Sequence, residues 1–180
     1  MTLTEVLHSL QKHLPDITLD QQQSEKGDSW IVAPAEEILR VLSCLKNDLG
    51  ISYLACLSGV DNESAFGVVY HLRSLKDKID VTIKAALPKE NPGIASVSGL
   101  FAVAQWFERE TFDMLGIQFQ GHPDLRRILL PEDWVGYPLR KDYQPPTEYN
   151  GIPADRPDAH ALFDKFYPKP KPADDPSQAS

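Results

Sequence analysis

The stretch Ile79–Leu87 (IDVTIKAAL) alternates apolar side chains with mostly polar ones along its length. A repeat of two predicts a β-strand with one buried face and one largely wetted face. Two further β-prone runs lie upstream, at Ile51–Val60 and Phe66–Leu72, and the polar turns Asp61-Asn62 and Lys76-Asp77-Lys78 separate the three runs. Such short links between consecutive strands predict an antiparallel meander.

Helical periodicity flanks this meander on both sides. Thr4–His13 reads as a short amphipathic helix, and Pro34–Leu49 reads as a second helix that begins at its proline and stops at Gly50. A third helical pattern covers Val97–Leu115 and ends at Gly116, where a left-handed glycine is favoured. Each pattern presents one apolar face, which needs a partner to cover it.

Shorter extended segments are predicted at Trp30–Val32, Ile117–Phe119 and Ile128–Leu130. Together the elements predict the α+β class, with helices packed on one face of a mainly antiparallel sheet. This domain is expected to span residues 1–142.

The remainder, residues 143–180, is predicted to be an extended proline-rich C-terminal arm. Eight of the 15 prolines lie between Pro145 and Pro176, and such a composition cannot bury a core of its own. Apolar anchors are nevertheless spaced through it, namely Tyr149, Leu162, Phe163, Phe166 and Tyr167. An arm that wraps a partner fits this pattern, and a tail that folds back on its own domain is the alternative.

Composition excludes several classes of function. The formal net charge of -8 argues against nucleic-acid binding and against adhesion to anionic lipid. No apolar run approaches the roughly 20 residues of a membrane helix, and residues 1–5 lack the features of a secretory signal. The two cysteines, Cys44 and Cys56, are too few for an iron–sulfur cluster and are expected to be buried free thiols.

The third helical pattern carries an unusual charge arrangement. On a helical wheel Glu108 falls inside the apolar arc, Glu110 lies at its edge, and Arg109 and Asp113 lie opposite, where they can pair on an outer face. A carboxylate on an apolar arc needs a partner, because burying it alone is very costly. We therefore expect Glu108 to pair with the segment Arg126-Arg127. The alternative places Glu108 at a frayed, exposed helix end.

The segment from Glu108 to Leu129 resembles the signature of the complex I 30 kDa subunit family, the C-type subunits of NADH-quinone oxidoreductase. The family pattern is Glu-Arg-Glu, two variable residues, an acidic residue, two large apolar residues, a six-residue gap, His or Lys, three more residues, and then a basic residue and two aliphatic ones. The matching positions are Glu108, Arg109, Glu110, Asp113, Met114, Leu115, His122, Arg126, Ile128 and Leu129. The stretch Gly136–Tyr143 (GYPLRKDY) is also similar to the family.

The resemblance implies a non-catalytic structural component of the hydrophilic arm of a proton-translocating NADH:quinone oxidoreductase. Such a component braces the hydrogenase-like D-type subunit (49 kDa type) near the quinone site, beside iron–sulfur subunits. It lies peripherally on the cytoplasmic side of the inner membrane, holds no metal or cofactor itself, and leaves FMN and the iron–sulfur clusters to partner subunits. The chain would be linked to quinone only through the other subunits of the complex.

The expected contact residues follow from the same resemblance. Arginine and tyrosine are frequent interface anchors, and any one of these side chains could instead be solvated or paired internally. The expected signature or contact residues are Glu108, Arg109, Glu110, Asp113, His122, Arg126, Arg127, Tyr137, Arg140, Asp142 and Tyr143.

Three rival interpretations remain open at this point. The equivalent component of a membrane-bound hydrogenase, a formate hydrogenlyase or a photosynthetic complex I-like machine would share the family but use another electron donor. A hydrolase could use Glu108, Glu110, Asp113 and His122 as acids and bases, although the wheel puts Glu108 and Asp113 on different faces. A free-standing adaptor domain is the third.

Overall fold

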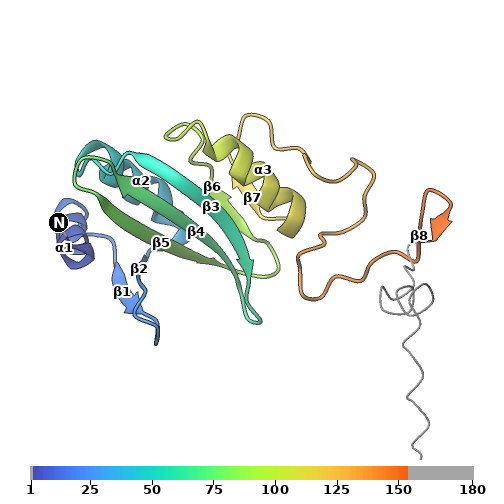
Figure 1. Ribbon diagram of the computed structural model, residues 1–180, viewed down its shortest axis with the longest axis horizontal. Coiled ribbons are helices and arrows are strands. Elements are labelled where there is room, and N and C mark those ends of the chain that lie inside the picture. The colour runs from blue at the N-terminus through green and yellow to red at the C-terminus, as the bar shows by residue number, and fades with distance from the viewer. Residues whose placement is uncertain (1, 154–180) are drawn as a thin grey trace, which may run out of the picture. The chain divides into compact units, whose positions relative to one another are not determined.

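Three long strands and three helices dominate the part of the chain that the computed structural model describes, residues 2–153 (Figure 1). The elements are α1 (Leu3–His13), β1 (Asp20–Gln23), β2 (Ser29–Val32), the 3₁₀ turn η1 (Ala35–Glu37), α2 (Ile38–Asn47), β3 (Tyr53–Asp61), β4 (Phe66–Ser74), β5 (Ile79–Leu87), β6 (Gly93–Ala95), α3 (Ala104–Leu115), β7 (Gln118–Gln120), β8 (Glu148–Tyr149) and β9 (Ile152–Pro153). The chain divides into two units, Met1–Tyr143 and Gln144–Ser180.

The main sheet of the first unit has the strand order β1-β2-β5-β4-β3. Strands β3, β4 and β5 pair antiparallel in sequence order, so the predicted meander is confirmed. Strand β2 joins the other edge of β5 in parallel, which makes the sheet mixed although mainly antiparallel. The predicted α+β class is confirmed.

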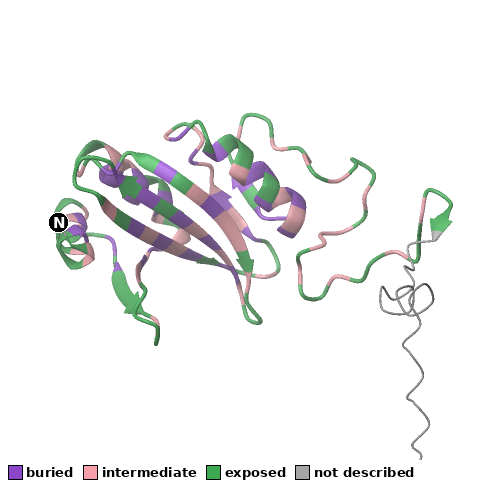
Figure 2. Ribbon diagram, viewed as in Figure 1, coloured by how far each residue is buried: buried purple, intermediate pink, exposed green. Residues whose placement is uncertain are grey.

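One face of this sheet forms the core. Along β4 and β5 every second residue is buried, as the alternating colours of these strands in Figure 2 show. The register sets Tyr70 opposite Ile83 and Leu72 opposite Val81 on the buried face. Burial of each such side chain contributes about 1.5–3 kcal/mol. The amphipathic helices α1 and α2 add their apolar stripes to the same core cluster. Helix α1 begins at a capping box in which Thr2 and Glu5 satisfy each other's backbone N–H groups.

Helix α3 packs against the edge strand β3, at a place where the strand has no side chain. A β-carbon at Gly59 would lie 2.5 Å from Leu115 Cδ1 and 2.7 Å from Thr111 Cγ2. The absence of a side chain at Gly59 therefore lets the helix backbone approach the sheet. The helix ends at Gly116 in the left-handed conformation (φ 74), as the sequence predicts.

Several boundaries differ from the predictions. Helix α3 begins at Ala104 and not at Val97, because residues 97–103 form hydrogen-bonded turns instead. Strands β1 and β6 were not predicted, since both are short and lack a clear alternation. The predicted strand Ile128–Leu130 is wrong, because the N–H groups of these residues bond to a side chain and not to a neighbouring strand.

The second unit is described as far as residue 153. Its strands β8 and β9 form a hairpin whose turn, Asn150-Gly151, has positive φ at both residues. Tyr149 lies in this hairpin, whereas the other apolar anchors predicted for the arm lie outside the described residues. Within residues 2–153, no helix combines the length and the apolar character needed to cross a membrane.

Candidate functional site

Most of the residues singled out by the sequence gather around helix α3, which is covered on two sides. One side packs on β3, and the other is overlaid by residues 125–143, here called the covering segment. The covering segment has no helix or strand of its own. Its backbone groups are bonded largely by charged side chains, which take the place of regular secondary structure.

Asp113 is the centre of this arrangement and is fully buried. Its Oδ2 accepts the N–H groups of Ile128, Leu129 and Leu130 at 3.0, 2.7 and 3.0 Å. Its Oδ1 accepts Arg127 Nη1 at 2.8 Å. Burial alone would raise the pKa of Asp113, but these donors outweigh burial and hold its pKa below the ordinary value.

The hydrogen bonds by which Asp113, Arg109, Arg127 and Arg140 join α3 to the covering segment are here called the clamp. Arg127 extends the clamp further along the covering segment. Its Nη2 donates to the carbonyl oxygens of Trp134 and Gly136, each at 3.1 Å, and its guanidinium lies 5.3 Å from the Tyr137 ring centroid. Arg109 lies one turn before Asp113 on α3, and it donates to the carbonyl oxygens of Arg126 and Arg127 at 3.1 and 3.2 Å. These arginines therefore fix the backbone of the segment from its start to Gly136.

Arg140 closes the end of the clamp. Its Nε donates 2.7 Å to the carbonyl oxygen of Leu115, and its guanidinium lies 4.5 Å from the ring centroid of Tyr137 and 5.0 Å from that of Phe66. A β-carbon at Gly116 would lie within 2.6 Å of both Tyr137 and Arg140. The side chains of Tyr137 and Arg140 therefore occupy the space that a side chain at the helix-ending Gly116 would need.

The predicted partner of Glu108 is wrong. The Glu108 side chain is buried, as the wheel predicts, but its Oε2 accepts Ser96 Oγ at 2.6 Å and its Oε1 accepts the Val97 N–H at 2.7 Å. His122 Nε2 lies 4.0 Å from Glu108 Oε2 and 3.1 Å from the carbonyl oxygen of Gln105. Glu108 therefore joins α3 to the loop before it, while Arg127 bonds to Asp113 and Arg140 bonds to the backbone of α3.

The predicted outer-face pair of Arg109 with Asp113 is also wrong. Both residues are buried, because the covering segment lies over the face of α3 that the wheel assigned to solvent. The other predicted residues divide into two groups. Glu110, Arg126 and Asp142 are exposed, and Arg126 pairs with Asp124 at 3.0 Å, whereas Tyr143 is half-buried against Gly136.

Sequence reasoning missed two contributors to the site. The Ser96 hydroxyl and the Val97 N–H donate hydrogen bonds to the buried carboxylate of Glu108. Their only signal in the sequence is a short polar turn before a helix. Gly59 is the second, since an isolated glycine in a strand pattern marks a close approach of another backbone. Of the two cysteines, Cys44 is buried and Cys56 is half-buried, and both are free thiols.

The buried Glu108 gives a pH-dependent prediction. Burial raises its pKa, against the opposing hydrogen bonds from Ser96 and Val97 and the nearby His122. A raised pKa means that the native state takes up the proton more readily than the unfolded chain. The stability that Glu108 contributes is therefore full below the unfolded pKa and is lost as pH rises through the folded value.

Glu108→Gln is expected to remove this loss, because a neutral amide can accept from Val97 N–H and donate to Ser96. The unfolding free energy of the variant minus that of the native chain should increase across the pH range above the ordinary pKa of a glutamate carboxyl. Urea titrations at several pH values measure it. A difference that stays constant over that range would contradict the assignment.

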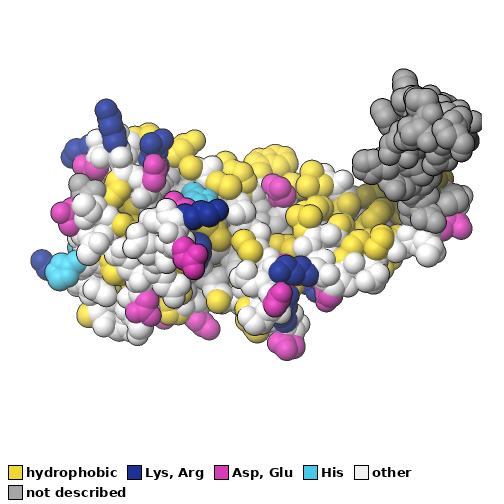
Figure 3. All heavy atoms as spheres, turned by 60° about the horizontal axis from the view of Figure 1, so that its bottom comes forward, with side chains coloured by type: hydrophobic (Ala, Val, Ile, Leu, Met, Phe, Trp, Pro, Cys, Tyr) yellow, Lys and Arg dark blue, Asp and Glu magenta, His cyan; other side chains and the backbone are white. Residues whose placement is uncertain are grey.

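The geometry does not suit acid–base chemistry. The carboxylates of Glu108 and Asp113 are fully buried and are each engaged by backbone N–H donors, so neither is open to a substrate. On the face shown in Figure 3, positive and negative side chains lie next to one another among apolar ones. Within residues 2–153, no group of three or more His, Cys, Asp and Glu side chains is placed to hold a metal ion.

Comparison with known proteins points to one family. Residues 31–149 match the family model of the respiratory-chain NADH dehydrogenase 30 kDa subunit. The C-type subunit of NADH-quinone oxidoreductase from Chloroherpeton thalassium is 52% identical over 106 residues, which are 58% of this chain and 44% of that relative. A solved trypsin-resistant fragment of Nqo5 is 30% identical with a TM-score of 0.59, over 69% of this chain and 100% of the fragment.

A further relative joins two subunits in one polypeptide. The fused C/D-type subunit of NADH-quinone oxidoreductase from Methylococcus capsulatus is 39% identical over 138 residues, which are 70% of this chain and 24% of that longer protein. The match to the family model covers more than half of the sequence and includes all of α3 and the covering segment. The chain therefore belongs to the 30 kDa subunit family of respiratory-chain NADH dehydrogenase.

Proposed function

We propose that this chain is a structural, non-catalytic component of the hydrophilic arm of a proton-translocating NADH:quinone oxidoreductase. It braces the hydrogenase-like subunit near the quinone site and lies peripherally on the cytoplasmic side of the membrane. It holds no cofactor, and FMN and the iron–sulfur clusters belong to partner subunits. Electron transfer from NADH to quinone is supported by keeping those partners in fixed geometry.

The fused relative supports the hydrogenase-like, D-type subunit as the partner. In the C/D protein a region similar to this chain is covalently joined to the D-type region, so the two fold within one polypeptide. Covalent joining raises the effective concentration of two binding surfaces. Such a fusion is most useful where the separate subunits already bind each other.

The single observation that carries the proposal is the pinned covering segment. Ordering an irregular segment costs about 1–2 kcal/mol per residue, and here buried charges offset that cost. The segment nevertheless presents large apolar side chains to solvent, with Leu129 61%, Val135 78% and Leu139 62% exposed. A rigid segment with exposed aliphatic side chains is preorganised for binding, because little order remains to be imposed on association.

Two separate charged substitutions test this surface. Leu139→Asp and Leu129→Asp are each expected to lower the amount of hydrogenase-like subunit recovered with a tagged chain by about tenfold or more, since a carboxylate would be buried at the interface. Leu75→Asp is the matched control, because Leu75 is 68% exposed in the turn between β4 and β5. All three variants should melt close to the native chain.

The measurement is recovery of the tagged chain from gently solubilised native membranes, followed by mass spectrometry. Recovery of the hydrogenase-like subunit with Leu139→Asp and Leu129→Asp at the level of Leu75→Asp would reject this surface. The native preparation also identifies the machine. Co-purification of the NADH-binding flavoprotein supports the respiratory enzyme, and a catalytic hydrogenase component without it supports the related machine. A chain recovered alone from the soluble fraction supports the adaptor.

A further inference from the structure

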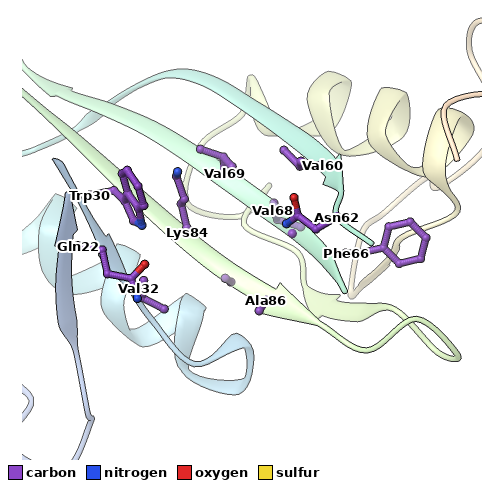
Figure 4. Close-up of a pocket in the computed structure, with 12 residues that line it drawn as sticks. Gln22, Trp30, Val32, Val60, Asn62, Phe66, Val68, Val69, Lys84 and Ala86 are labelled. Atoms are coloured by element: carbon purple, nitrogen blue, oxygen red, sulfur yellow. The ribbon is translucent and has the colours of Figure 1, made fainter. Parts of the chain in front are cut away.

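The outer face of the main sheet is apolar at one end. An antiparallel sheet whose other face is covered normally turns polar side chains to water. Here Trp30 and Val32 of β2, Val69 of β4 and Val60 of β3 lie on that outer face (Figure 4). Further along β4, the same face becomes polar at His71 and Arg73.

The apolar end is also concave. It encloses about 400 Å³, with β2, β5, β4 and β3 as its floor. Figure 4 places Gln22 and Asn62 toward opposite ends, so amide groups flank the apolar centre. Four strands span about 14 Å at ordinary strand spacing, which is the length of about four extended residues. The hollow is therefore sized for a short protein segment.

Lys84 stands in the middle of this hollow. It is the sole charged residue among those that line it, and its Nζ lies 3.4 Å from the Trp30 ring centroid. Among residues 2–153 no carboxylate lies within ion-pair distance of it, although the chain carries 26 acidic residues and 18 basic ones. Lys89, by contrast, is paired with Asp61. A lysine held over an aromatic ring in apolar surroundings leaves its charge available to a partner.

We propose that this hollow, here called the sheet-face hollow, binds a segment of a neighbouring subunit in which one carboxylate stands between aliphatic or aromatic side chains. The carboxylate pairs with Lys84, and the flanking side chains cover Trp30 and Val69. The amides of Gln22 and Asn62 are placed to bond the backbone of the segment. This contact is separate from the covering segment, so it adds a second docking site to the proposed function on which it rests.

Site-specific photo-crosslinking tests the location. A benzophenone amino acid at Val69, in the intact complex in native membranes, is expected to crosslink to a peptide of another subunit that contains Asp or Glu among apolar residues. The same probe at Arg73 is the control, because it lies on the same strand and face, four residues away at the polar end. Crosslinks to a second copy, to this chain's own residues or to lipid would each overturn the proposal, as would the absence of any crosslink.

Charge variants test the chemistry. Lys84→Met keeps the apolar stem over Trp30 and removes the charge, and it should lower the crosslink yield from Val69 by about tenfold. Lys84→Arg should retain most of the yield. Equal yields for the two variants would overturn the role of the charge. Recovery of the hydrogenase-like subunit in the same preparation tests the proposed function separately, since either result can fail while the other stands.

Discussion

Asp113→Ala is expected to lower the free energy of unfolding by about 3–5 kcal/mol. The substitution removes the acceptor of four hydrogen bonds at once and leaves Arg127 partly buried without its carboxylate. Amide hydrogen exchange should speed up at Ile128, Leu129 and Leu130, because their N–H groups lose their common partner. Chemical denaturation and exchange measured by mass spectrometry check both effects.

Asp124→Ala is the matched control for that prediction. Asp124 also pairs with an arginine at 3.0 Å, but its side chain is 54% exposed, so solvent screens the pair and its loss should cost far less stability than the loss of Asp113. Adding Arg127→Met to Asp113→Ala should restore part of the stability, because the unpaired charge is removed. Equal effects for Asp113→Ala and Asp124→Ala would show that burial of the clamp contributes nothing.

The stability that Asp113 contributes changes with pH in the opposite direction to the stability that Glu108 contributes. The pKa of Asp113 is held below its ordinary value, so its contribution is full above the unfolded pKa and is lost as pH falls through the folded value. Glu108, whose pKa is raised, loses its contribution as pH rises. Two carboxylates five residues apart on one helix thus have pKa values shifted in opposite directions. Four hydrogen-bond donors lower the pKa of Asp113, whereas burial dominates at Glu108 and raises its pKa.

The fold could be predicted from the sequence where periodicity is strong. The alternation in Ile79–Leu87 and its two neighbours gives the meander, and 3.6-residue spacing gives the helices, because each pattern has one face to bury. Strand β2 was predicted as a strand, yet its parallel pairing with β5 was not, since pairing partners leave no local trace. The same holds for the short parallel pair of β6 and β7.

The site could be predicted in its residues but not in its contacts. A helical wheel assumes one buried face, and α3 has two, because the covering segment lies over the second. That segment has no repeat that would reveal what it covers. Arg109 and Asp113 were therefore placed in solvent, although they form the buried clamp. The family signature thus marks both the buried side chains of the clamp and the exposed Leu129, while Leu139 lies in the similar stretch that follows.

Gly59→Val is expected to lower the free energy of unfolding by about 3 kcal/mol, at the upper end of ordinary overpacking. The first added carbon would already lie 2.5 Å from Leu115 Cδ1 and 2.7 Å from Thr111 Cγ2, and both side chains are buried in the contact of α3 with β3. Gly59→Ala should show a smaller loss in the same direction. Ser58→Val is the control, because it adds the same branched side chain to the outer face of the same strand.

Substitutions at Gly59 and at the exposed leucines are expected to affect stability and assembly differently. Helix α3 carries the clamp, so a helix pushed away from the sheet displaces the covering segment with it. Gly59→Val should therefore lose both thermal stability and recovery of the hydrogenase-like subunit, whereas Leu139→Asp should lose recovery alone. Melting curves and membrane pull-downs on the same variants distinguish the two. A stable Gly59→Val chain that still recovers this partner would mean that α3 can move without disturbing the surface, and the clamp would then have to act on the covering segment independently of the sheet.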